Sequence, residues 1–156
     1  MQFKRSMASA FAALVLASSF SAANVIPVEG KAPIWSNSIK VPYRSWLPAK
    51  KPQEILLCVH GLGFSSLSYT EFGHVMASRG YGVYALDVRG FGEWMDKREN
   101  RVDFEGCLND IEAALKTLRK NYPGCKIDLV GESMGGAIVL AAASRNPQLV
   151  DGIISS

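Results

Sequence analysis

The chain has 156 residues, enough for one globular domain, and its 48% hydrophobic and 20% charged residues suit a packed core with an ordinary surface. The formal net charge is +3, and Lys and Arg form no cluster interleaved with aromatic residues. Nucleic-acid binding usually requires such a basic patch, so we expect no nucleic-acid partner.

Residues 1–23 have the features of a secretory signal peptide. Lys4 and Arg5 form a basic segment, residues 7–20 are apolar or small, and small residues precede a cleavage point after Ala23. The apolar segment is too short to span the ~30 Å hydrocarbon core of a membrane. We therefore predict a mature chain that begins at Asn24, is secreted or periplasmic, and keeps no membrane span after cleavage.

The cysteines are odd in number, which argues against a complete disulfide framework. Cys107 and Cys125 flank a predicted helix whose ends lie ~20 Å apart, beyond the reach of a disulfide. The spacings, with Cys58 included, match no zinc pattern. We expect free or buried thiols, no metal site and no cofactor.

From residue 39 onward, strand and helix patterns alternate. Ile39, Val41 and Tyr43 alternate with polar or turn residues, which predicts an exposed early strand. The continuous apolar segment 55–59 predicts a strand buried on both faces, followed by a loop at 60–63.

A first helix is expected after this loop. Ser68 and Glu71 have the spacing of a capping box at its start, and Gly80 suits its end. Its apolar side is formed by Phe72, Val75 and Met76. Residues 83–86 predict the next strand, and 88–101 form a loop that is first glycine-rich and then charged.

A longer helix follows Asp103, which can cap it, and the pair Pro123–Gly124 ends it. Its apolar side is formed at helical spacing by Cys107, Ile111, Leu115 and Leu118. Two more buried strands, at 127–130 and 150–154, flank a small-residue helix at 136–145. This order predicts an α/β fold with a mostly parallel sheet, right-handed crossovers and flanking helices.

Residues 131–135 have the sequence Gly-Glu-Ser-Met-Gly, a G-x-S-x-G motif between a predicted strand and a predicted helix. Such a turn exposes the hydroxyl of Ser133, while Gly131 and Gly135 leave room for the strand and helix to approach. The helix is brought close to the sheet by Gly136, Ala137, Ala141 and Ala142. We therefore predict that Ser133 is a catalytic nucleophile.

A second motif, His60, Gly61, Leu62 and Gly63, follows the buried strand at 55–59. Such a loop can aim the Leu62 N–H at a developing oxyanion, and the N–H of Met134 would be the other donor. His60, Gly61 and Gly63 are expected to support this loop, and His60 is expected to brace it by hydrogen bonds.

Other polar residues are assigned structural or solvated positions. His74 lies off the apolar side of its helix and is expected at the surface. Asp87 or Arg89 is expected to hold local structure by ion pairs or backbone hydrogen bonds. The charged residues 96–99 are expected in a solvated loop.

The sequence resembles the α/β-hydrolase superfamily, and most of all its branch of monoacylglycerol lipases, lysophospholipases and serine-aminopeptidase-like domains. The motifs that carry the resemblance are, in order, residues 59–63, 87–92 and 131–136, and the match covers about 35–156. The resemblance implies that residues 24–156 are the N-terminal part of an α/β-hydrolase domain, ending after the strand that follows the nucleophile helix. It also implies that Ser133 is the nucleophile and that Leu62 and Met134 provide the oxyanion hole.

The chain departs from the family in its triad. The family order is Ser, then Asp or Glu, then His, and here no residue beyond Ser156 supplies the last two. His60 and His74 are the two histidines, and neither is in the family's base position. We therefore expect this chain to be a fragment that is inactive alone, with an open apolar strand edge at Ile153 and Ile154.

The sequence thus predicts a serine hydrolase of carboxylic esters, lysophospholipase- or monoacylglycerol-lipase-like, whose partner is a small acyl ester or lipid. One alternative is a non-catalytic hydrolase relative that binds a ligand or has lost its use. A further alternative is a nucleotide-binding domain, since Gly61 and Gly63 follow a strand and Asp87 ends the next one. That alternative leaves the Ser133 turn unexplained.

Overall fold

The structure is a computed structural model, and it describes residues 26–28, 41–96 and 101–156. The predicted signal peptide, Ile39 and the charged residues 97–99 lie outside the described residues. Secretion and cleavage after Ala23 therefore stay predictions.

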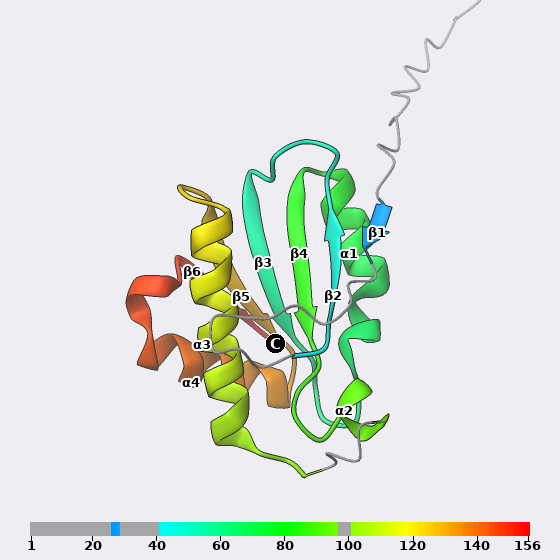
Figure 1. Cartoon of the computed structure of the whole chain (residues 1–156), viewed down its shortest axis with the longest axis vertical. Helices are drawn as coiled ribbons and strands as arrows, with labels where there is room; N and C mark the ends of the chain where they lie inside the picture. Colours follow the sequence, from blue (N-terminus) through cyan, green and yellow to red (C-terminus); the bar gives the residue numbers. More distant parts are fainter. Residues whose placement is uncertain (1–25, 29–40, 97–100) are drawn as a thin grey trace, which may run out of the picture.

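A six-stranded sheet forms the centre of the described chain (Figure 1). Its order is β1-β2-β4-β3-β5-β6, where β3, β4, β5 and β6 are parallel and β1 and β2 are antiparallel. The strands are β1 (Ile26–Val28), β2 (Tyr43–Leu47), β3 (Glu54–Val59), β4 (Tyr81–Leu86), β5 (Lys126–Gly131) and β6 (Gly152–Ser155). The predicted α/β fold with a mostly parallel sheet is confirmed.

Helices cover both faces of the sheet (Figure 1). The helix α1 packs on one face, and α3 and α4 pack on the other. The helices are α1 (Thr70–Ser78), α2 (Glu93–Asp96), α3 (Phe104–Asn121) and α4 (Met134–Arg145), with 3-10 turns η1 (Ser66–Tyr69) and η2 (Pro147–Leu149). None of the helices within 41–96 and 101–156 has both the length and the apolar character needed to cross a membrane.

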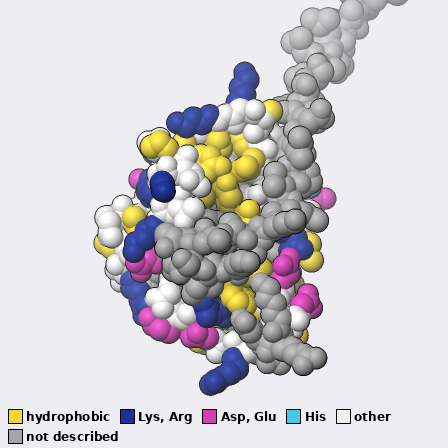
Figure 2. Space-filling model, in the orientation of Figure 1, with side chains coloured by type: hydrophobic (Ala, Val, Ile, Leu, Met, Phe, Trp, Pro, Cys, Tyr) yellow, Lys and Arg dark blue, Asp and Glu magenta, His cyan; other side chains and the backbone are white. Residues whose placement is uncertain are grey.

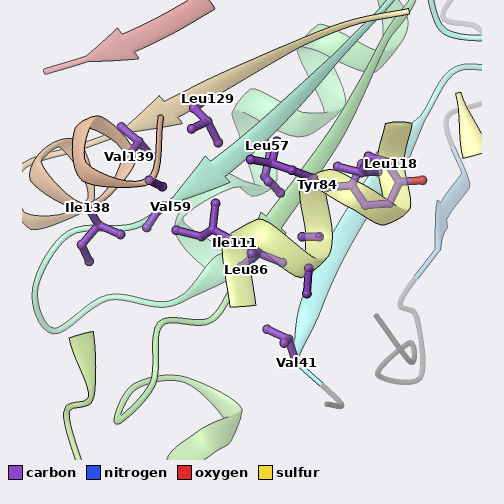
Figure 3. Close-up of a cluster of buried hydrophobic side chains, with 14 of the residues drawn as sticks. Val41, Leu57, Val59, Tyr84, Leu86, Ile111, Leu118, Leu129, Ile138 and Val139 are labelled. Carbon is purple, nitrogen blue, oxygen red and sulfur yellow. The ribbon is translucent and has the colours of Figure 1, made fainter. Parts of the chain in front are cut away.

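The core is divided by the alternation of side chains along the buried strands. Ile55, Leu57 and Val59 of β3 face α3 and α4, whereas Leu56 and Cys58 face α1. Figure 3 shows the larger cluster, in which side chains from strands, α3 and α4 point toward one another. Figure 2 shows hydrophobic side chains gathered over the upper part of β3 and β4, with charged side chains toward the margins.

Several predicted details of the second half are confirmed. Asp103 caps α3, since its Oδ1 accepts a hydrogen bond from the Gly106 N–H at 2.9 Å. The predicted apolar side of α3 is buried. The three cysteines are all free and buried.

The early strand differs from its prediction. It starts at Tyr43, and Val41 lies before it as a buried core residue. Ser45 and Trp46 within the strand are buried as well, because β2 lies between β1 and β4 rather than at an exposed position.

The predicted start of the first helix is wrong. Ser65, not Ser68, caps the segment by accepting a hydrogen bond from the Leu67 N–H, and the turn η1 precedes α1. Ser68 instead donates its hydroxyl to the Ser65 carbonyl at 2.8 Å. The hydroxyl thus makes a local backbone bond that competes with capping.

The side of α1 that meets the sheet differs in part from its prediction, since Phe72 and Met76 pack against the core as predicted but Val75 does not. Val75 is exposed, while Gly73 and Ala77 are buried. A Cβ at Gly73 would overlap the Trp46 ring, so α1 lies directly on that indole. His74 is half-buried with its ring edge-on to Trp46 at 6.3 Å, and the prediction of a solvated His74 is wrong.

Two further expectations need correction. The loop at 88–101 contains α2, which is held by Trp94, a buried residue whose indole N–H donates to the Asp87 carbonyl at 2.9 Å. Ala137 and Ala141 of α4 are exposed, so they do not bring that helix to the sheet. The buried small residues of α4 are Gly135, Gly136, Ala142 and Ala143.

Candidate active site

Ser133 lies in a strained turn between β5 and α4. Its φ is 53° and its ψ is −117°, and it is the one non-glycine residue with positive φ among those the structure describes. A β-carbon makes such a conformation costly by about 1–3 kcal/mol, so surrounding contacts must hold it. The side chain is exposed at the carboxyl end of the parallel strands.

Close backbone packing imposes this turn. A Cβ at Gly131 would overlap the Gly135 carbonyl, and a Cβ at Gly135 would overlap the Val59 carbonyl of the neighbouring strand. Gly135 also donates its N–H to the Glu132 carbonyl at 2.8 Å. The two glycines therefore let the first turn of α4 lie against the ends of β5 and β3.

The loop at 60–63 lies beside this turn. The position of a Cβ on Gly61 is 3.5 Å from the Ser133 Cβ and 3.4 Å from the Glu132 carbonyl oxygen. The structure thus brings together the two motifs that the sequence separates by some 70 residues, as the parallel sheet predicts.

Two backbone donors near Ser133 are available to a ligand. Within the described residues, neither the Leu62 N–H nor the Met134 N–H is bonded to a protein acceptor. Met134 is the first residue of α4, where the helix dipole favours negative charge. This arrangement agrees with the predicted oxyanion role, which stays a prediction.

His60 is completely buried and uses both ring nitrogens within the protein. Its Nε2 accepts a hydrogen bond from the Val88 N–H at 3.0 Å, so Nδ1 carries the proton and donates to the Gly61 carbonyl at 2.8 Å. Burial lowers the pKa of His60, although its contact with Gly61 and the charge of Asp87 oppose that shift. The ring braces the loop, as expected, and is not free to act as a base.

Arg89 and Asp110 form a second structural contact below this site. The Arg89 guanidinium donates two hydrogen bonds to the Asp110 carboxylate, at 2.7 and 2.8 Å. This bidentate contact raises the pKa of Arg89. It ties the segment after β4 to α3, so the structural role expected for Arg89 is confirmed.

The Ser133 hydroxyl has no hydrogen-bond partner among the described residues. His60 is committed to the backbone, and His74 packs on Trp46 away from this turn. Among the described residues, the predicted nucleophile and the predicted oxyanion donors therefore have no base in contact with them. His, Cys, Asp and Glu of this part form no group able to hold a metal ion.

Comparison with known proteins places this site in a family. A model of the family described as serine aminopeptidase, S33, matches residues 50–156, which include both motifs. The chain belongs to this family of α/β-hydrolases.

Relatives within the superfamily include lipases and esterases. The monoglyceride lipase of Mus musculus is 32% identical over 111 residues, covering 71% of this chain and 37% of that protein. A thermostable carboxyl esterase from Bacillus coagulans superposes with a TM-score of 0.67 at 26% identity, over 78% of this chain and 41% of that one. The monoacylglycerol lipase of Paleococcus ferrophilus superposes with a TM-score of 0.59 at 25% identity, over 76% of this chain and 43% of that one.

The chain thus spans about two fifths of the length of the relatives it matches. The part that the family model matches, residues 50–156, includes Ser133.

The structure also identifies residues that sequence patterns did not single out. Phe64, Leu67 and Met95 are exposed apolar side chains on the loops that surround the Ser133 turn. The sequence shows that these residues are apolar. It does not show that they lie close together, because that depends on how the two segments fold.

Proposed function

We propose that this chain provides the nucleophile and oxyanion hole of a serine hydrolase that acts on carboxylic esters, with lipid-like esters preferred. The observation that carries the proposal is the strained conformation of Ser133, at φ 53°, between β5 and α4. Strain of this kind persists where the surrounding structure enforces it, most often at active sites.

The reaction follows from the geometry. The Ser133 Oγ attacks the ester carbonyl carbon and loses its proton to a base, and the carbonyl oxygen becomes an oxyanion. The N–H groups of Leu62 and Met134 would donate to that oxyanion, each lowering the barrier by about 3 kcal/mol. The tetrahedral intermediate expels the alkoxide, which takes the proton from the protonated base and leaves as the alcohol, and water then hydrolyses the acyl-enzyme.

The substrate class is proposed from the relatives. One is described as a monoglyceride lipase and another as a carboxyl esterase, while the family description names an aminopeptidase. The exposed apolar residues around Ser133 favour a lipid-like ester over a peptide, because a peptide would need polar partners for its amide groups.

The general base must come from outside the described residues, since both histidines are committed elsewhere. Without a base, a serine hydroxyl is a weak nucleophile near pH 7. The described residues alone are therefore proposed to be inactive. The alternative of a non-catalytic relative rests on the same missing base.

The nucleotide-binding alternative is not favoured. Asp87, the acid that would contact a ribose, is 2% exposed and uses both carboxylate oxygens on backbone N–H groups. Its burial leaves it out of reach of a sugar hydroxyl.

The test is covalent labelling of the full chain with a fluorophosphonate, with and without added imidazole as an external base. We expect imidazole to accelerate labelling, and mass spectrometry to find the label on Ser133. The Ser133→Ala variant should not be labelled, whereas Ser144→Ala, which removes an exposed hydroxyl of α4, should be labelled like the unchanged chain.

Equal labelling of Ser133→Ala would contradict the proposal. Absence of any labelling, even with imidazole, would favour the non-catalytic alternative.

A further inference from the structure

A buried carboxylate joins the two loops beside Ser133. Asp87, which follows β4, accepts a hydrogen bond from the Ser66 N–H at 2.7 Å on one carboxylate oxygen. The other oxygen accepts from the Glu93 N–H at 2.8 Å. One side chain thus connects two segments. They are the turn η1, which follows the loop at 60–63, and the helix α2, which follows β4.

Arg44 of β2 joins the same two segments from outside. Its Nη1 donates to the Ser66 hydroxyl at 2.8 Å, and its Nη2 lies 3.7 Å from a carboxylate oxygen of Glu93. Ser66 and Glu93 are therefore linked through their backbones by Asp87 and through their side chains by Arg44. Two independent links indicate that the spacing of these segments is fixed.

The linked segments are the walls of a groove of about 560 Å³. This volume is in the range of pockets that hold small-molecule ligands. One wall comes from residues 63–68 and the other from 91–95, and the lining includes Phe64, Leu67 and Met95. None of the described residues that line it is charged, so this lining suits an uncharged, apolar chain.

The groove lies near the Ser133 turn. The position of a Cβ on Gly61 is 3.6 Å from the Phe64 ring, which lines the groove, and 3.5 Å from the Ser133 Cβ.

We propose that Asp87 is a positioning residue, which locks the turn η1 to α2 and so holds open the apolar groove near Ser133. The proposed occupant of the groove, the hydrocarbon chain of an ester, rests on the proposed function. The proposed role of Asp87 in setting the spacing of the groove walls rests on the contacts alone.

The first test compares Asp87→Asn with Asp110→Asn. Both carboxylates are buried, but Asp110 binds the Arg89 side chain and makes no hydrogen bond to Ser66 or Glu93. An Asn at 87 has one oxygen acceptor and would turn its NH₂ toward the other backbone donor, so one wall is released. Losing a hydrogen bond to a charged group is expected to accelerate amide hydrogen exchange at Ser66 or Glu93 about tenfold or more.

The second readout is the affinity of the groove for diphenylhexatriene, a neutral, rod-shaped fluorescent probe. We expect Asp87→Asn to weaken probe binding about fivefold or more, because the released wall no longer presents a preformed site. Asp110→Asn should leave both the exchange of these two amides and the probe affinity unchanged, even where it lowers the melting temperature.

A second pair of variants acts without removing a charge. Gly92 and Gly124 both have positive φ, 57° and 78°. A Cβ at Gly92 would overlap the Asp87 carboxylate, whereas a Cβ at Gly124 has nothing within 4 Å. Gly92→Ala and Gly124→Ala therefore share the backbone strain, and Gly92→Ala alone displaces Asp87.

We expect Gly92→Ala to reproduce the exchange and binding changes of Asp87→Asn, and Gly124→Ala to show neither. The positioning role is overturned if Asp87→Asn and Gly92→Ala match their controls in both readouts. Neither readout depends on labelling of Ser133, so failure of the proposed esterase function would leave this test intact.

Discussion

At the scale of single residues, His60 shows how burial decides a chemical role. The imidazole is enclosed between the Val88 N–H and the Gly61 carbonyl, and its ring meets Phe91 edge-on at 6.1 Å. Protonation of Nε2 would set an N–H against the Val88 N–H and break that contact. The loop at 60–63 thus depends on a neutral His60.

This dependence predicts how stability varies with pH. The folded pKa of His60 lies below its ordinary value of 6.5, so below that pH the unfolded chain binds a proton that the folded chain does not. Stability is therefore lost as pH falls through about 6.5, with a slope of up to about 1.4 kcal/mol per pH unit. We expect His60→Gln, whose amide can bond both backbone partners, to lose less stability between pH 7.5 and 5.5.

Urea-unfolding midpoints measured across this pH range provide the check. His74→Gln is the matched control, since His74 has no hydrogen bond to the oxyanion loop among the described contacts. A steep acid slope that persists in His60→Gln, or that disappears in His74→Gln instead, would contradict the assignment.

The sequence predicted the sharp turn at Ser133 and the bracing role of His60, because both residues lie in short motifs whose geometry is local. It did not predict the partners of Asp87, because Ser66 and Glu93 come from separate loops whose conformations no periodic pattern specifies. His74 was misplaced for a similar reason, since the Trp46 ring that covers it belongs to a distant strand.

At the scale of elements, the contact between α4 and β3 determines the position of Ser133. The first turn of α4 lies so close to β3 that Gly135 has no space for a side chain next to the Val59 carbonyl. Val59 O also accepts a hydrogen bond from the buried Tyr69 hydroxyl at 2.9 Å, which fixes this point from the other face of the sheet.

We expect Gly135→Ala to destabilise the protein by about 3 kcal/mol, because the new methyl group meets backbone that cannot move aside. Gly136→Ala is the control. Its Cβ would lie 2.5 Å from the Ser155 hydroxyl, a side chain that can rotate away, and Ala favours the helix. Urea-unfolding midpoints should separate the two variants, and equal losses would show that α4 can shift away from β3.

The predicted boundaries of helices and strands agree with the structure where one sequence signal dominates. They disagree where several signals compete. The buried strands β3 and β5 and the helix α3 lie within about one to three residues of their predictions, since hydrophobic patterns and caps agree there. Ahead of α1, Ser65 caps the turn η1, and α1 itself begins after Tyr69 without a side-chain cap. The space beside Gly73, which is taken by Trp46, could not be inferred from helical spacing.

At the scale of the whole molecule, the sheet is asymmetric. Alternating strands and helices predicted its parallel part, but the strand order and the antiparallel position of β2 depend on which strands meet across the chain. One outer strand of the described sheet is β6, which carries Ile153 and Ile154 at 42% and 53% exposure. A hollow of about 460 Å³ lies next to it, lined in part by Leu140 and Pro147.

An exposed apolar strand edge is a site for association between chains. We expect the chain to self-associate at micromolar concentration and Ile154→Lys to weaken this association about tenfold or more, since a lysine at the edge opposes strand pairing. Val75→Lys is the matched control, because Val75 is 43% exposed on α1, which covers the sheet away from β6. Light scattering coupled to size exclusion measures the effect; a monomeric unchanged chain, or equal loss in both variants, would show that β6 does not drive association.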